Sequence, residues 1–259
     1  MNMSKTQTVK EKTNKTKNNN YMSIEIAVNQ KKAYEIFTDS STYDENNYDS
    51  EKESDPLVRF DEEINFKKDV KGVDICFLLD SSGIMKPYMR GSKVIIRGIV
   101  RDAIRCITQF KVLNDDMLRI ALVCYRDNDD KSQDTFTFDF TNEHYKFKEI
   151  LKSVNAKGDS KECEAILDGL NQVVNNLTWR NNSEKILFHL MNAPTSNSLI
   201  ESKNNGVDLE SIMIQMREME IDYTVVQLNE STNKIIEKLS EYVEIDVLKI
   251  NVETDKKWL

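Results

Sequence analysis

The stretch 73–85, VDICFLLDSSGIM, constrains the fold more than any other part of this sequence. Its apolar run, 75–79, is short and is closed by the small polar residues DSSG. A short apolar run that ends in this way is typical of a fully buried strand in a parallel sheet. Residues 86–110 then show helical periodicity. We therefore expect a strand, a tight polar loop and a helix, with the loop at the carboxyl edge of an α/β sheet, where such folds bind ligands.

Two interpretations of the polar loop are open. Asp80 and Ser82 offer hard oxygen atoms, which are the ligands that Mg²⁺, Mn²⁺ and Ca²⁺ prefer. The same two side chains are also good caps for the helix that follows them. From this loop alone, a cation site and a simple helix cap are equally compatible with the residues.

The first 70 residues differ in composition from the rest. Lys, Asn and Thr dominate the first twenty, acidic residues dominate 39–63, and large apolar side chains are sparse. Such a segment buries too little apolar surface to offset the entropy that ordering costs. We expect residues 1–70 to form a disordered or weakly structured arm, 71–252 to form one domain, and 253–259 to form a tail.

Charge and hydropathy exclude several classes of function. The chain of 259 residues has a formal net charge of −8, so a nucleic-acid partner has no electrostatic support. No apolar run approaches the length of a membrane span, and the N-terminus lacks the apolar core of a secretory signal. The four cysteines form no C-x-x-C pair, as in reduced cytosolic proteins. We expect a cytoplasmic location.

Strand and helix patterns alternate across the domain. We expect strands at 73–79, 118–125, 135–140, 185–191, 221–228 and 243–252, and helices at 86–110, 143–154, 163–177, 209–219 and 233–242. The period-two stretch TFTFDF follows its neighbour too closely for a crossover helix, which predicts an antiparallel strand at the sheet edge. The fold class is therefore α/β, a mostly parallel sheet with helices on both faces. Neither G-x-G-x-x-G nor a P-loop motif occurs, so nucleotide binding is unsupported.

Two histidines and one tryptophan are weaker candidates. His189 stands inside an apolar strand, which favours a core histidine with satisfied hydrogen bonds over a ligand or a catalytic base. His144 begins a helix and is expected at the surface. Trp179 is expected to pack against the end of the preceding helix. A Ser-His-Asp triad has little support.

Several motifs together carry a resemblance to a family. They are VDICFLLDSSGIM, the run ALVCYRDNDD from Ala121, LTWR at 177–180, KILFHLMNAP from Lys185 and STNKIIEKL from Ser231. With these motifs, residues 71–252 resemble a von Willebrand factor A (vWA) domain, in particular the intracellular type attached to alpha-kinases. The resemblance implies a three-layer Rossmann-like fold.

The resemblance also implies a metal-ion-dependent adhesion site, which this sequence departs from. The first loop of the family, Asp-x-Ser-x-Ser, corresponds to Asp80, Ser82 and Ile84, and isoleucine supplies no hydroxyl. A threonine of the second loop corresponds to Ser160 or Glu162, and an aspartate of the third corresponds to the neutral Asn192. A divalent cation needs about six oxygens and compensating charge. We therefore expect weak or absent binding of Mg²⁺ or Mn²⁺.

The expected function is a non-catalytic module that binds a protein partner at the carboxyl edge. The partner-binding residues would be Asp80, Ser82, Asp127, Glu162 and Asn192. Asp127, with Asp129 and Asp130, is either an assisting metal ligand or part of a solvated acidic loop. Two alternatives belong to other classes: a regulatory subunit that acts in trans on a separate alpha-type kinase, and a metal-assisted enzyme that uses Asp80, Asp127 and Glu162.

Overall fold

A six-stranded sheet forms the centre of the protein, with strand order β5-β4-β3-β6-β7-β8. The structure is a computed structural model, and it describes residues 27–28, 58–59, 72–109, 116–126, 135–157, 166–192 and 208–250. The strands are β3 (Val73–Asp80), β4 (Leu118–Tyr125), β5 (Thr135–Thr141), β6 (Glu184–Met191), β7 (Ile221–Gln227) and β8 (Ile245–Lys249). All neighbouring strands are parallel except β4 and β5, which are antiparallel. The predicted α/β class and the antiparallel edge strand are confirmed.

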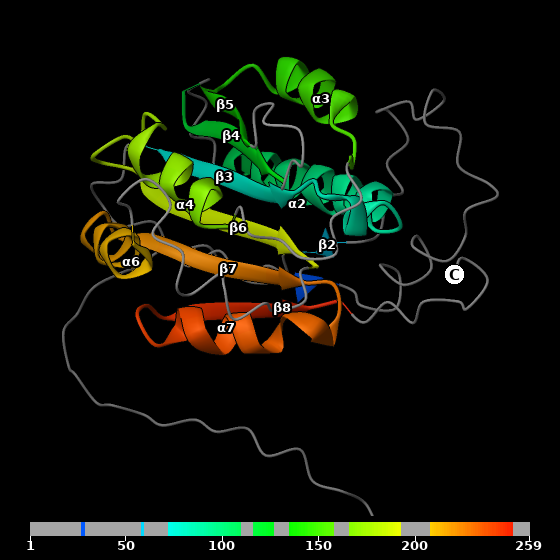
Figure 1. The fold of residues 1–259 in the computed structure, drawn as a ribbon. Helices are drawn as coiled ribbons and strands as arrows, with labels where there is room; N and C mark the ends of the chain where they lie inside the picture. The colour runs from blue at the N-terminus through cyan, green and yellow to red at the C-terminus, as the bar shows by residue number, and fades with distance from the viewer. Residues whose placement is uncertain are drawn as a thin grey trace, which may run out of the picture.

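Helices cover both faces of this sheet (Figure 1). α2 (Met89–Gln109) and α3 (His144–Ser153) pack on one face. α4 (Ile166–Asn175), α6 (Leu209–Glu218) and α7 (Asn233–Ser240) pack on the other. β3 supplies both cores by simple alternation, because Ile75, Phe77 and Leu79 enter the first cluster while Cys76 and Leu78 enter the second. The fold thus has three layers.

The start of the first helix differs from the expectation. Residues Gly83–Met85 form a 3-10 turn, η1, and α2 begins at Met89, so Pro87 precedes the helix instead of lying in its first turn. The reason is local: Met85 N–H donates to Ser82 O and Tyr88 N–H donates to Met85 O, which closes tight turns before the helix starts. The loop after β3 is thereby held close to the sheet.

The last strand is also shorter than expected. β8 ends at Lys249, and Ile250 N–H donates to Gln227 O of β7 at 2.9 Å. Two further strands of two residues each, β1 (Ala27–Val28) and β2 (Val58–Arg59), pair with each other in antiparallel fashion. A second 3-10 turn, η3 (Glu230–Thr232), precedes α7. The remaining residues of the predicted arm, and the tail 253–259, lie outside the described residues.

None of the described helices is both long and apolar enough to cross a bilayer.

Candidate functional site

The carboxyl edge of the sheet brings together the first and third predicted loops. Asp80 ends β3 opposite Tyr125, and Leu79 pairs with Leu190, two residues before Asn192. Asp80 and Ser82 are fully buried, and Asn192 is 6% exposed. Parallel register alone therefore places Asp80, Ser82 and Asn192 at one edge, as the sequence predicted.

Local hydrogen bonds fix the loop after β3. Ser82 N–H donates to Asp80 Oδ1 at 2.9 Å, so the Asp80 carboxyl holds the turn after β3. Ser81 donates to Tyr125 O through both its backbone N–H, at 2.8 Å, and its hydroxyl, at 3.0 Å. Lys157 N–H donates to Ser81 O at 3.0 Å. The segment that leads toward Glu162 therefore starts beside the first loop.

Asn192 connects three parts of this edge. Its Nδ2 donates to Ile84 O at 3.4 Å, and its side chain and that of Asn229 hydrogen-bond the hydroxyl of Tyr88. Burial raises the pKa of Tyr88 above its ordinary value, against the smaller opposing effect of these hydrogen bonds. Tyr88 and Asn229 were not predicted. The available signal was the position of Asn229 just after β7, where polar residues follow the other parallel strands.

Two polar atoms at this edge have no partner among the described residues. Ser82 Oγ and Asn192 Oδ1 are buried and make no hydrogen bond with that part of the chain. Leaving a buried polar atom without a hydrogen bond costs about 1–3 kcal/mol. A ligand that formed hydrogen bonds to such atoms would gain affinity by satisfying them.

The other predicted site residues cannot be placed. Asp127, Asp129 and Asp130 lie in the gap 127–134, and Ser160 and Glu162 lie in the gap 158–165, both outside the described residues. Their roles remain predictions from the sequence.

The described residues do not make a site for a divalent cation. They bring one carboxyl, Asp80, and one hydroxyl, Ser82, to the edge, while Ile84 contributes no side-chain oxygen and Asn192 carries no charge. Within the described ranges no group of three His, Cys, Asp or Glu side chains lies close enough to hold a metal. This donor set is short of the oxygens and the charge that Mg²⁺ and Ca²⁺ require.

The core histidine is saturated by two tyrosines. His189 on β6 is fully buried, with Nε2 2.7 Å from Tyr125 Oη and Nδ1 2.7 Å from Tyr223 Oη. Burial lowers the pKa of His189 to about 3, so the ring is neutral and donates to one hydroxyl while accepting from the other. The prediction of a satisfied core histidine is confirmed. The surface prediction for His144 is wrong in part, because its ring is half-buried and burial lowers its pKa.

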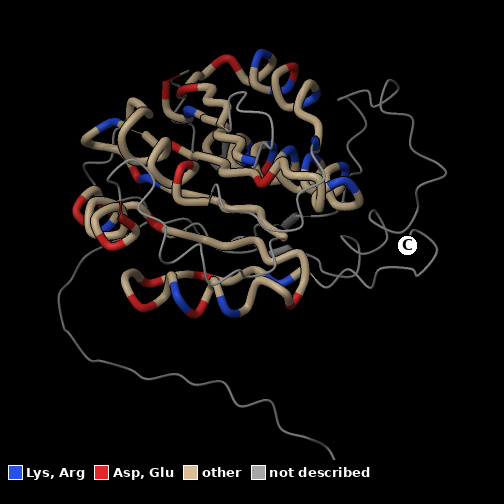
Figure 2. The backbone as a smooth tube through the Cα atoms, in the orientation of Figure 1, with Lys and Arg blue, Asp and Glu red and all other residues tan. Residues whose placement is uncertain are grey.

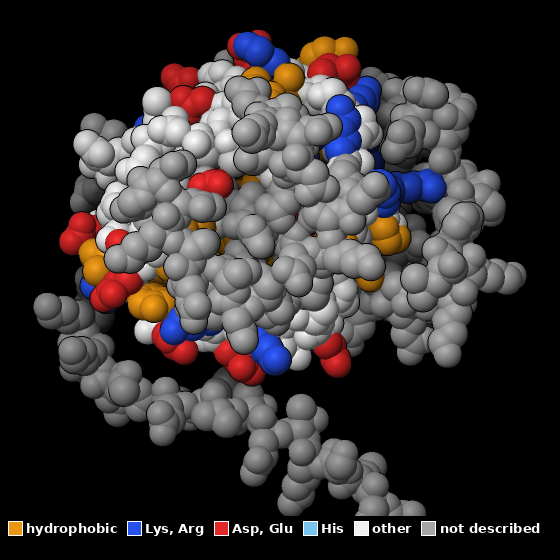
Figure 3. All heavy atoms as spheres, viewed as in Figure 1, with side chains coloured by type: hydrophobic (Ala, Val, Ile, Leu, Met, Phe, Trp, Pro, Cys, Tyr) orange, Lys and Arg blue, Asp and Glu red, His pale blue; other side chains and the backbone are white. Residues whose placement is uncertain are grey.

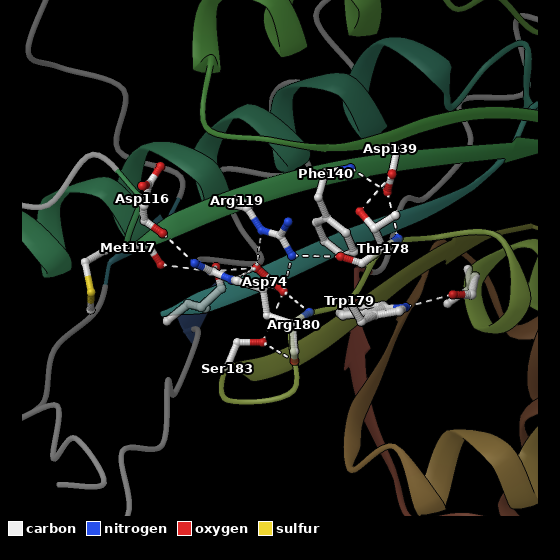
Figure 4. Close-up of polar contacts among 12 residues, drawn as sticks. Asp74, Asp116, Met117, Arg119, Asp139, Phe140, Thr178, Trp179, Arg180 and Ser183 are labelled. Carbon is white, nitrogen blue, oxygen red and sulfur yellow. Dashed lines mark hydrogen bonds and ion pairs between the residues drawn. The ribbon is translucent and has the colours of Figure 1, made fainter. Parts of the chain in front are cut away.

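The best-developed polar cluster lies at the opposite, amino-terminal edge of the sheet (Figure 4). The buried Asp74 on β3 accepts from Arg119 Nε at 3.0 Å and from Arg119 Nη2 at 2.7 Å. It also accepts from Arg180 N–H and Nε, both at 2.9 Å, and from Ser183 Oγ at 3.1 Å. The fork of Arg180 reaches the carbonyl oxygens of Asp116, Val73 and Met117 as well. This cluster joins the starts of β3 and β4 to the segment before β6.

The pKa of Asp74 indicates that this cluster has a structural role. Burial alone raises the pKa of Asp74, but the hydrogen bonds from Arg119 and Arg180 outweigh that effect and hold the pKa below its ordinary value. Trp179 Nε1 donates to Val173 O of α4 at 2.8 Å, and its ring contacts that of Phe140. Trp179 therefore packs against the preceding helix, as predicted. Both oxygens of the Asp74 carboxylate accept hydrogen bonds from these described partners, so this carboxylate serves the fold and not a ligand.

No family model matches this chain. Over 166 residues it is 23% identical to the alpha-protein kinase vwkA of Dictyostelium discoideum; the match takes in 61% of this chain and 25% of that protein. The chain thus spans about a quarter of the length of the curated relative that it matches. Among solved structures, the conserved hypothetical protein BatB from Bacteroides thetaiotaomicron aligns with a TM-score of 0.49 and 13% identity, over 70% of this chain and 92% of that one.

Proposed function

We propose that this chain is a protein-binding module of vWA type whose partner docks at the carboxyl edge of the sheet. The observation that carries the proposal is the pair of buried atoms Ser82 Oγ and Asn192 Oδ1, which lack partners within the described residues. They stand beside the carboxyl of Asp80 at the edge where open α/β sheets bind ligands. Asp127 and Glu162, which lie outside the described residues, are assigned to the same surface by their sequence position.

Recognition at this edge is proposed to need no metal. Ile84 removes one oxygen of the family's site, and Asn192 is neutral where the family has a carboxylate. The amide of Asn192 instead hydrogen-bonds the Ile84 carbonyl and the Tyr88 hydroxyl. A partner is then recognised by direct hydrogen bonds to the loops.

The module is proposed to be non-catalytic. Ser82 would need a base to act as a nucleophile. His189 has both ring nitrogens occupied by tyrosines and is held neutral by burial, so it serves the core. The buried free thiols of Cys76 and Cys124 agree with a proposed cytoplasmic location.

A second candidate function is regulation of a separate alpha-type kinase. The similarity over 166 residues to the alpha-protein kinase vwkA favours it, because it links a region like this one to a protein named as an alpha-type kinase. This candidate uses the same docking edge and differs only in the partner.

The test combines metal titration with partner capture. Calorimetric titration of the full chain with Mg²⁺, Mn²⁺ and Ca²⁺ is expected to show no binding heat that depends on Asp80. The unmodified chain and the Asp80→Ala variant are expected to give the same result. Proteins that the chain captures from its source cell are expected to stay bound in EDTA. Capture is expected to be lost with Ser82→Ala and with Asn192→Ala. The control Arg217→Glu, at an exposed position of α6, is expected to capture the same proteins. Capture that depends on metal would refute the metal-free hypothesis. Capture that is unchanged by both Ser82→Ala and Asn192→Ala would refute docking at the carboxyl edge. A kinase among the edge-dependent proteins would favour the second candidate.

A further inference from the structure

A basic stripe runs along the outer side of α2. The helix carries five Lys or Arg residues and a single acid, Asp102, in a chain whose net charge is −8 (Figure 2). Its arginines follow one another at spacings of seven, four and four residues: Arg90, Arg97, Arg101 and Arg105. At about 100° per residue these positions fall within roughly 80° of one another, opposite the apolar side that packs on the sheet.

The members of the stripe reach the surface to different degrees. Arg90, Arg97 and Arg101 are half-buried and Arg105 is exposed, whereas Lys93 is buried and donates to Lys152 O at the end of α3. Arg101 and Arg105 both contact Asp102, at 3.1 and 3.6 Å. In Figure 3, Lys and Arg side chains gather on the face shown over the end of α3 and the beginning of α2. Of the four arginines, Arg90 and Arg97 lie further from Asp102 along the helix than Arg101 and Arg105 do.

One segment of the same chain has the complementary charge. Residues 39–55 contain seven Asp or Glu residues and one lysine. The segment ends three residues before β2, and β2 lies against α2. Fully extended, its seventeen residues reach about 56 Å at 3.3 Å each, while the 21 residues of α2 span about 32 Å. The segment is thus tethered beside the helix and long enough to follow it.

We propose that the α2 stripe is an intramolecular docking surface for the acidic segment 39–55. Tethering through β2 makes the contact an intramolecular one, with a high effective concentration. Because the contact is mainly electrostatic and partly exposed, added salt weakens it.

Chymotrypsin cleavage of the full chain tests this proposal, because Tyr43 and Tyr48 lie within the segment. The variant Arg90→Glu/Arg97→Glu is expected to raise the cleavage rate after these tyrosines at least fivefold at 50 mM NaCl. The control Arg217→Glu/Lys234→Glu changes the net charge equally on exposed positions of α6 and α7 and is expected to leave the rate unchanged. In 0.5 M NaCl the unmodified protein is expected to be cleaved as fast as the first variant.

A charge exchange separates specific docking from general loosening. Glu45→Lys/Glu51→Lys/Glu53→Lys is expected to raise cleavage in the unmodified helix background and to lower it again when combined with Arg90→Glu/Arg97→Glu. Circular dichroism at each step checks that α2 remains folded. Equal cleavage rates with and without the α2 substitutions at low salt would overturn the proposal, as would the absence of rescue in the combined variant.

Discussion

Protonation of His189 is the best-defined perturbation of this fold. The ring is fully buried between two tyrosine hydroxyls, each 2.7 Å from one of its nitrogens. A neutral imidazole satisfies this arrangement, because it has one N–H and one lone pair. An imidazolium has two N–H groups and a charge, which the buried site does not solvate. Burial accordingly lowers the pKa of His189 from 6.5 to about 3.

This shift makes stability depend on pH with a known sign. Between pH 6.5 and about 3 the unfolded chain binds a proton at His189 and the folded chain does not. Stability is therefore fully present above pH 6.5 and is lost as the pH falls below it. At about 1.4 kcal/mol per unit, linkage between these two pKa values predicts a loss of about 2 kcal/mol between pH 7 and pH 5. Most carboxyl groups titrate below this window.

Urea unfolding at pH 7, 6 and 5 measures the effect. His144 is the other histidine of the chain, and burial lowers its pKa too, so His144→Asn leaves His189 as the single histidine. This variant is expected to lose about 2 kcal/mol of unfolding free energy between pH 7 and 5. His144→Asn/His189→Gln keeps a hydrogen-bonding side chain that does not titrate and is expected to lose far less. Equal losses in the two variants, or an NMR titration of His189 with a midpoint above pH 5.5, would refute the reasoning.

Three further predictions concern other parts of the molecule. Asp74→Asn is expected to lower the unfolding free energy at pH 7 by about 3 kcal/mol in urea, because two partly exposed arginines lose their carboxylate. Since the pKa of Asp74 is lowered, the wild-type advantage over this variant is expected to shrink as pH falls below about 4. Gly169→Ala is expected to cost about 1–2 kcal/mol by thermal unfolding, because its Cβ would lie 2.8 Å from Tyr125 Cδ1; an unchanged melting temperature would contradict this. EDTA is expected to leave the melting temperature unchanged, and a clear drop would reveal a structural cation.

Local patterns of the sequence were sufficient to predict most of the sheet. β4 has the predicted bounds, and the period-two stretch became the antiparallel edge strand β5. The helix start was misplaced, because the 3-10 turn before Met89 depends on hydrogen bonds that periodicity does not report. Asp74 was missed for a related reason. Its partner Arg180 is 106 residues away, and nothing near Asp74 in the sequence indicates that contact.

The same limit applies to the candidate site. Asp80, Ser82 and Asn192 were predictable because each lies at or just after the end of a parallel strand, and parallel strands end at one edge. The contacts of Tyr88 with Asn192 and Asn229 were not, since Tyr88 lies in the turn before α2 and its direction is set by packing. Residue type and strand order together place the edge, and the turn geometry decides which side chains meet there.

The two edges of the sheet differ in how far their polar groups are satisfied, and this difference separates scaffold from site. At the amino-terminal edge, each oxygen of the Asp74 carboxylate accepts several hydrogen bonds from groups that are themselves held in place. Breaking that cluster would leave a buried charge without its partners and would destabilise the fold, so its groups are not available to a ligand. At the carboxyl edge, Ser82 Oγ and Asn192 Oδ1 are buried yet find no partner in the described part of the chain. A partner that supplies those two hydrogen bonds offsets the free energy that the folded chain loses by burying these atoms unpaired. This favours the carboxyl edge as the binding surface.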